Sequence, residues 1–135
     1  MKITKFNQSC LLVETKGKRI LVDPGNIGYE ESLLDEWIDI NYILVTHRHR
    51  DHCNVDVINK IAERDGSKIY TTHEVVEKVE LKDAIVIKAG DIIELEGIKV
   101  EVTKAVHGFF TKMKYTGAEI LENVGYIIDD GENRL

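Results

Sequence analysis

The sequence is 135 residues long, with 43% hydrophobic and 31% charged residues and a formal net charge of −6 at pH 7. This size and composition predict a single folded domain over residues 1–135 and exclude a disordered chain. The acidic charge argues against nucleic acid as a partner, and the absence of a long apolar run or signal peptide argues against a membrane.

The two cysteines, Cys10 and Cys53, lie far apart in the sequence and form no C-x-x-C pair. Such usage is typical of a protein in a reducing compartment rather than of a disulfide-linked scaffold. We therefore expect a cytoplasmic protein.

The first part of the chain predicts three strands separated by turns. They are expected at residues 2–6, 10–14 and 19–22. The third strand ends at Asp23-Pro24-Gly25-Asn26, which has strong turn chemistry. Taken alone, Asp23 is either a turn-former, which this chemistry favours, or an outer partner that fixes a ligand histidine.

Helical and strand patterns then alternate. The periodicity predicts a short helix over 31–38, a buried strand over 42–45, a helix capped by Asn54 or Asp56 and running to about residue 64, a strand over 68–71 and a short helix over 74–79. This alternation is typical of a layered α/β sandwich.

From residue 84 the pattern has a period of two. It predicts strands at 84–88, 91–95, 98–106 and 124–128, and Arg134-Leu135 resembles the start of another strand. The strand over 98–106 leads directly into His107-Gly108, and a polar and aromatic loop follows.

The densest chemical signal follows the buried strand at 42–45. Thr46-His47-Arg48-His49-Arg50-Asp51-His52 holds three of the five histidines of the chain. Neutral imidazoles and carboxylates are ordinary ligands of zinc and similar ions, and alternation in an extended backbone points His47 and His49 the same way. A solvated polar loop is the simpler alternative, but H-x-H-x-D-H directly after a strand favours a metal site.

These motifs resemble those of the metallo-β-lactamase superfamily. The match consists of Leu21-Val22-Asp23-Pro24-Gly25, the H-x-H-x-D-H block and Ala105-Val106-His107 at a later strand end. The opening Met1-Lys2-Ile3-Thr4 with Ser9-Cys10 is similar to the branch of small metal-dependent hydrolases that includes the ascorbate-6-phosphate lactonases.

The resemblance implies an αββα sandwich and a set of site residues. His47, His49 and His107 would bind one ion, Asp51 and His52 would bind a second, and Asp23 would support the site from behind the ligands. The cofactor would be one or two divalent ions, zinc first, with manganese or iron as alternatives. By contrast, His73 precedes a predicted helix and is expected to be either an N-terminal neighbour of that helix or a rim residue rather than a ligand. Cys53 is expected to pack beneath the loop rather than to bind metal.

The ligand set implies hydrolysis of a small-molecule substrate. Zinc-activated water would attack a small ester, lactone, thioester or phosphoester, and Asp51 would orient the water or relay its proton. Five residues of the loop after His107 either shape the substrate cleft or are ordinary loop residues: Phe109, Phe110, Lys112, Lys114 and Tyr115.

The chain is short for this superfamily. Members generally continue with an aspartate that bridges two metals and a later histidine, and neither follows Leu135. We therefore expect an incomplete sandwich, the N-terminal half with a mixed sheet and helices on one face, whose inner sheet face lacks a covering layer. Such a face predicts a homo-oligomer or a complementing second-half chain. A truncated sequence is the competing explanation.

Two functional hypotheses follow. The first is an active metal-dependent hydrolase. The second is a catalytically incompetent metal-binding or oligomerisation domain derived from such an enzyme, because the second metal site would have only Asp51 and His52.

Overall fold

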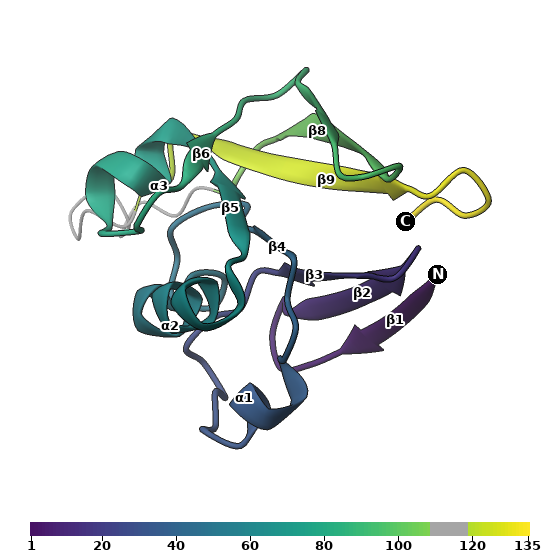
Figure 1. The fold of residues 1–135 in the computed structure, drawn as a ribbon. Helices are drawn as coiled ribbons and strands as arrows, with labels where there is room; N and C mark the ends of the chain where they lie inside the picture. Colours follow the sequence, from purple (N-terminus) through teal and green to yellow (C-terminus); the bar gives the residue numbers. More distant parts are fainter. Residues whose placement is uncertain (109–118) are drawn as a thin grey trace.

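The computed structural model describes residues 1–108 and 119–135. Within this part of the chain the secondary structure consists of nine strands and three helices (Figure 1). The strands are β1 (Lys2–Lys5), β2 (Leu11–Thr15), β3 (Lys18–Val22), β4 (Tyr42–Leu44), β5 (Lys68–Thr71), β6 (Ile85–Val86), β7 (Ile92–Glu94), β8 (Lys99–Ala105) and β9 (Asn123–Asp129). The helices are α1 (Leu33–Glu36), α2 (Val55–Asp65) and α3 (His73–Lys78).

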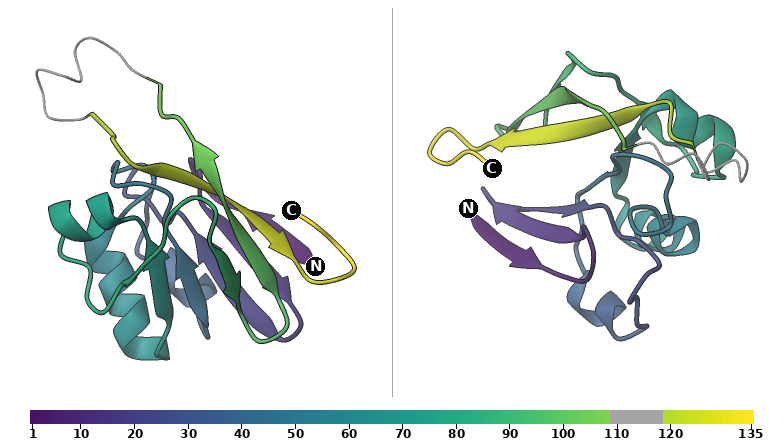
Figure 2. Two further views of the ribbon diagram at one scale, coloured as in Figure 1. Left: turned by 90° about the horizontal axis from the view of Figure 1, so that it is seen from above. Right: turned by 180° about the vertical axis from the view of Figure 1, so that it is seen from behind.

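The strands form two sheets. The larger has the order β1-β2-β3-β4-β5-β6 and is mixed, with antiparallel pairing from β1 to β3 and parallel pairing from β3 to β6. The smaller is the antiparallel sheet β7-β8-β9. A mixed α/β architecture with helices against one sheet face is therefore confirmed (Figures 1 and 2).

The two faces of the larger sheet bury different cores, because successive side chains of a strand point to opposite faces. Leu12, Leu21 and Ile43 belong to the core shared with the helices. Val13, Ile20 and Leu44 belong to the core shared with the smaller sheet. The alternating sequence pattern thus produces three layers in the described residues: helices, larger sheet and smaller sheet.

The expectation of an uncovered inner sheet face was wrong. The smaller sheet covers that face with apolar residues such as Leu95, Ile98 and Val100, all at most 1% exposed. The period-two segments of the later sequence pair with one another instead of extending the larger sheet, and so supply the covering layer. Self-association stays a prediction, but an uncovered sheet face no longer supports it.

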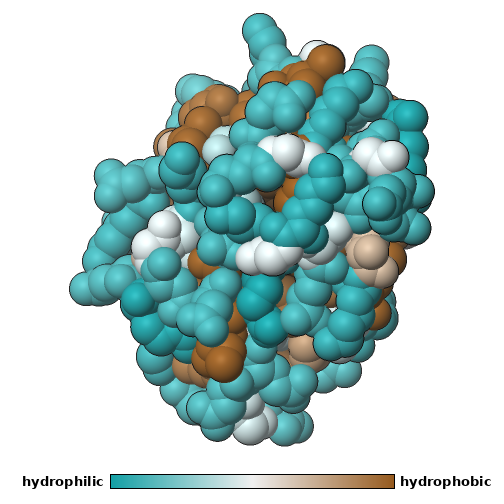
Figure 3. All heavy atoms as spheres, turned by 45° about the vertical axis from the view of Figure 1, so that its right-hand side comes forward, coloured by the Kyte–Doolittle hydropathy of each residue, from teal (hydrophilic) through white to brown (hydrophobic). Residues whose placement is uncertain are grey.

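The face seen in Figure 3 is mostly hydrophilic, with hydrophobic side chains in small separate groups. On the smaller sheet the apolar side chain of Ile92 is 60% exposed. The same sheet also carries charged residues, because Lys99 and Arg134 form ion pairs with Glu101. In the part of the chain that the structure describes, no helix is long and apolar enough to cross a membrane.

Helix α2 begins and ends at capping residues that can be recognised in the sequence. Its N-cap is Asn54, whose side chain accepts a hydrogen bond from the backbone N–H of Val57, and its C-cap is Gly66 in the left-handed conformation at φ 70°. Ile58 and Ile61 are fully buried, as the periodicity predicts. This helix follows the histidine-rich loop directly and fixes its C-terminal end.

Candidate metal centre

The centre forms where the parallel strands β3 and β4 end side by side. Val22 pairs with Leu44 at the ends of the two strands, so Asp23 and Thr46 emerge at the same edge of the sheet. Ligand sites in such sheets lie outside the carboxyl ends of the strands. The backbone N–H of Asp23 donates to the carbonyl of Leu44 over 2.9 Å, which ties the first loop residue to the neighbouring strand.

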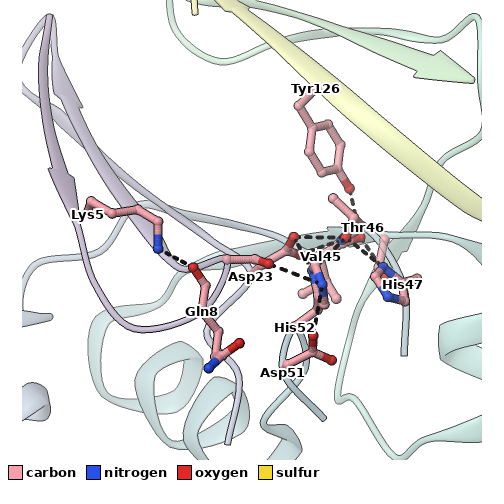
Figure 4. Close-up of polar contacts among 11 residues, drawn as sticks. Lys5, Gln8, Asp23, Val45, Thr46, His47, Asp51, His52 and Tyr126 are labelled. Carbon is pink, nitrogen blue, oxygen red and sulfur yellow. Dashed lines mark hydrogen bonds and ion pairs between the residues drawn. The ribbon is translucent and has the colours of Figure 1, made fainter. Parts of the chain in front are cut away.

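Asp23 holds three donors with its buried carboxylate (Figure 4). Its Oδ1 accepts from the backbone N–H of Thr46 at 2.8 Å. Its Oδ2 accepts from the Thr46 hydroxyl at 2.8 Å and lies 2.8 Å from His52 Nδ1. Asp23 also has a left-handed φ of 49°, which aspartate tolerates better than most residues. Asp23 is therefore a turn residue that also contacts His52, and its support of a metal ligand stays a prediction.

Three histidines converge in front of this support. His47, His49 and His107 each offer a nitrogen, and these atoms all lie within 4.8 Å of one another. The ring centroids of His49 and His107 are 4.6 Å apart, and those of His47 and His107 are 4.8 Å apart. The structure thus brings together residues that are about 60 positions apart in the sequence, as the resemblance implied.

His47 provides the test of whether a metal fits. Its side chain is 3% exposed, and in the described chain its Nε2 is buried without a hydrogen-bond partner. Burial, followed by the nearby His52, His49 and His107, lowers the pKa of His47 to about 3, against an opposing effect of Asp51. A neutral imidazole with an unsatisfied buried nitrogen is the state that binds a divalent ion, so these residues fit one.

The hydrogen bonds also determine which nitrogen His47 and His107 offer. Thr46 Oγ1 donates its only proton to Asp23 and lies 3.0 Å from His47 Nδ1, so it accepts from that nitrogen. His107 Nδ1 lies 2.8 Å from the carbonyl of Gly108 and must donate to it. In both histidines Nε2 is left as the nitrogen with a free lone pair.

Asp51 and His52 form a separate pair beside the three histidines. His52 Nε2 lies 3.4 Å from Asp51 Oδ2 and 3.2 Å from Ser9 Oγ. Burial opposes protonation of His52, but its hydrogen bond to Asp23 and the charges of Asp23 and Asp51 raise its pKa. A second ion at Asp51 and His52 stays a prediction, and among the described residues the group of three possible ligands is His47, His49 and His107.

The turn after β3 packs tightly under the histidine-rich loop of residues 46–52, which we call the ligand loop. A Cβ added to Gly25 would lie 2.2 Å from the carbonyl oxygen of Asp51, so only glycine fits here without a shift of backbone. The backbone N–H of Asn54 donates to the carbonyl of Pro24 over 2.8 Å. The loop that begins at Asp23 therefore sets the path of the loop that carries His47 and His49.

We expect Gly25→Ala to lower the free energy of unfolding by about 1–3 kcal/mol, because the added methyl group must displace the Asp51 backbone. Gly108→Ala is the matched control, since in the described structure its Cβ would meet nothing within 4 Å, and its effect should stay within about 0.5 kcal/mol. Urea unfolding followed by circular dichroism measures both. Equal effects of the two substitutions would contradict the packing argument.

Sequence reasoning missed two residues of the centre. Thr46 bridges Asp23 to His47, and Ser9 contacts His52. The contacts of Thr46 with Asp23 and of Ser9 with His52 are tertiary, so the only signals were that Thr46 precedes the first histidine and that Ser9 belongs to the family-like Ser9-Cys10 pair.

Other sequence expectations can also be placed. His73 is exposed at the start of α3, and Cys53 is buried, with burial raising its thiol pKa to about 12. The predicted cleft residues Phe109, Phe110, Lys112, Lys114 and Tyr115 lie outside the described residues.

Comparison with curated proteins identifies similar chains. A UPF0173 metal-dependent hydrolase of Korarchaeum cryptofilum is 33% identical over 111 residues, covering 79% of this chain and 49% of that protein. Another, from Thermoplasma acidophilum, is 32% identical over 134 residues, covering 97% of this chain and 57% of that protein. The chain thus spans about half the length of these relatives.

Solved structures share the fold. Igni18, described as a novel metallo hydrolase from Ignicoccus hospitalis, aligns with a TM-score of 0.67 at 24% identity over 96% of this chain and 56% of that chain. MEM-A1, a subclass B3 metallo-β-lactamase from a soil metagenome library, aligns with a TM-score of 0.66 at 13% identity over 88% of this chain and 50% of that chain.

The family model that matches this sequence is described as a β-lactamase superfamily domain, and the match extends over residues 2–135. It includes the histidine-rich loop, Asp23 and His107. This chain belongs to the β-lactamase superfamily.

Proposed function

We propose that the chain carries the metal centre of a metal-dependent hydrolase that acts on a small ester, lactone, thioester or phosphoester. The single observation that supports it best is the convergence of His47, His49 and His107 around the unpartnered Nε2 of His47. The relatives named as metal-dependent hydrolases add to this support.

In this proposal His47, His49 and His107 hold a divalent ion, with zinc favoured by three imidazole ligands and manganese or iron as alternatives. Such an ion supplies Lewis acidity, which lowers the pKa of water and polarises a carbonyl or phosphoryl oxygen of the substrate. Asp23 holds Thr46, and the Thr46 hydroxyl accepts from His47 Nδ1, so these two residues orient the ring of His47 from behind.

Asp51 is the proposed catalytic carboxylate. Its side chain is 36% exposed, so water and substrate can reach it, and Oδ2 lies 3.4 Å from His52 Nε2. The carboxylate would accept a hydrogen bond from the attacking water and take up its proton. His52, which Asp23 holds through Nδ1, would keep Asp51 in place.

A metal-binding domain without hydrolytic activity of its own is the second candidate. It is favoured by one observation: within the described residues, a second ion beside Asp51 and His52 has only that pair of side chains. In that case a second copy of this chain or another chain would have to complete the second ion site. We therefore propose a homo-oligomer or a complementing partner for this candidate.

The test is hydrolysis of a panel of ester, lactone, thioester and phosphodiester substrates by chelator-stripped and zinc-reloaded protein. We expect turnover that returns with zinc, is lost in His47→Ala and persists in His73→Ala, which alters the exposed histidine at the start of α3. Stoichiometric zinc binding without turnover would favour the second candidate, and turnover that survives in His47→Ala would contradict the proposed site.

A further inference from the structure

A buried carboxylate, Glu74, contacts the loop of His47 and His49 through Arg48. Glu74 lies in the first turn of α3 and is 5% exposed, which is rare for a glutamate unless its charge is compensated. Its Oε1 accepts from Arg48 Nε at 3.0 Å. Its Oε2 accepts from the backbone N–H groups of Leu121 and Glu122 at 2.8 and 2.7 Å.

Two further hydrogen bonds join the segments around Glu74, Arg48 and residues 119–122. The backbone N–H of Glu74 donates to Glu122 Oε2 at 2.8 Å, and Arg48 Nη2 donates to the carbonyl of Glu119 at 2.6 Å. Burial works against ionisation of Glu74, but the Glu122 amide, Arg48 and the Leu121 amide outweigh it and hold the Glu74 pKa below its ordinary value. We call these five residues the Glu74 network: Arg48, Glu74, Glu119, Leu121 and Glu122.

The Glu74 network joins two parts of the chain that carry metal ligands. Arg48 stands between His47 and His49 in the ligand loop. On the other side, Ala105 of β8 pairs with Asn123 of β9, so His107 and Leu121 leave the same end of the smaller sheet. Fixing Leu121 and Glu122 to the first turn of α3 therefore fixes the end of the smaller sheet from which His107 projects.

We propose that Glu74 is a positioning residue of the metal centre, which holds the His107 end of the smaller sheet in register with the loop of His47 and His49. This inference rests on the proposed metal centre. It extends that proposal, because Glu74 reaches the ligands only through Arg48 and the 119–122 backbone and offers no ligand atom itself.

Glu74 is not the only tie between the sheets. The Tyr126 hydroxyl donates to the carbonyl of Val45 at 2.8 Å, and the backbone N–H of Val124 lies 3.4 Å from the carbonyl of Thr46. Loss of the Glu74 carboxylate should therefore loosen the relation of His107 to the other two histidines without abolishing the fold. Outer partners of metal ligands typically change metal affinity by about 10- to 100-fold.

The test is Glu74→Gln, compared with Glu77→Gln on the same helix. Both oxygens of Glu74 accept from donors, so either orientation of the new amide places an NH₂ group against an N–H donor. Glu77 is exposed, and its recorded ion pair is to the adjacent Lys78 at 3.6 Å. Zinc affinity by competition with a chelator and amide hydrogen exchange at Leu121 and Glu122 are the two readouts.

We expect Glu74→Gln to weaken zinc binding about 10-fold and to speed exchange of both amides, while Glu77→Gln changes neither. In the wild-type protein zinc should slow exchange of the same amides, because coupling between two sites is reciprocal, and this effect should shrink in Glu74→Gln. Arg48→Lys, which keeps the charge but loses the planar guanidinium, should weaken zinc binding in the same direction and serves if Glu74→Gln does not fold.

Unchanged zinc affinity in Glu74→Gln, with faster exchange at Leu121 and Glu122, would overturn the inference and leave Glu74 a purely structural residue. Failure of the wild-type protein to bind zinc, manganese or iron would instead refute the proposed metal centre. The two failures are thus distinguishable in one experiment.

Discussion

Asp23→Asn is expected to lower the free energy of unfolding by about 3–5 kcal/mol, because it removes a buried charge that three donors share. The carboxylate accepts from the backbone and hydroxyl of Thr46 and from His52 Nδ1. With asparagine, one oxygen becomes an NH₂ group that faces N–H or O–H donors. Chemical denaturation of the chelator-treated protein measures the loss without a contribution from metal.

Asp83→Asn is the control for this substitution. Asp83 has a similar left-handed φ of 52° but is exposed, so it reports the backbone preference without the buried hydrogen bonds. Its effect should stay within about 0.5 kcal/mol. A loss below about 1 kcal/mol in Asp23→Asn would show that the Asp23 carboxylate does not support the centre as described.

His107→Ala is expected to weaken zinc binding by more than about 100-fold while leaving the metal-free protein nearly as stable as the wild type. Removal of a ligand should exceed the 10- to 100-fold effect typical of an outer partner. His107 is only partly buried, and within the described residues its side chain forms a hydrogen bond to its own neighbour Gly108, so little of the described fold depends on it. Calorimetric zinc titration and urea unfolding measure the two quantities.

His73→Ala is the matched control, because it removes an exposed histidine that is not part of the three-histidine group. Its zinc affinity and stability should equal those of the wild type. Wild-type zinc affinity in His107→Ala would mean that this histidine is not a ligand and that the geometry of the three rings has another cause.

The parts of the fold that the sequence predicted are those with local causes. The strand over 42–45, the α2 helix with its Asn54 cap, and the period-two strands follow from side-chain periodicity and capping chemistry. Short elements were less well predicted: the helix expected over 31–38 is only Leu33–Glu36, and the strand expected over 84–88 is only Ile85–Val86. Tertiary packing rather than local propensity decides such ends.

The residues of the candidate site also differ in whether the local sequence identifies them. His47 and His49 are recognisable because their spacing and the preceding strand lie within one short stretch of sequence. His107 could be assigned only through the order of motifs in a known family, since about 60 residues separate it from His47. The contacts of Thr46 and Glu74 could not be predicted, because they depend on strand order and join distant segments of the chain.

The covering of the larger sheet by the smaller one could not be predicted from the sequence. The sequence showed that residues 91–106 and 124–128 form strands, but not that they pair among themselves into a second sheet. Pairing between strands is a long-range property, and period-two patterns specify which face is apolar rather than which strand is the neighbour.

The central claim is that His47, His49 and His107 hold one divalent ion. Zinc K-edge X-ray absorption on protein loaded with one equivalent of zinc tests it most directly, because it reports the atoms around the metal. We expect a shell that includes three imidazole nitrogens at about 2.0–2.1 Å and that loses one imidazole in His107→Ala. A shell with fewer imidazoles in the wild type, or one that His107→Ala leaves unchanged, would contradict it.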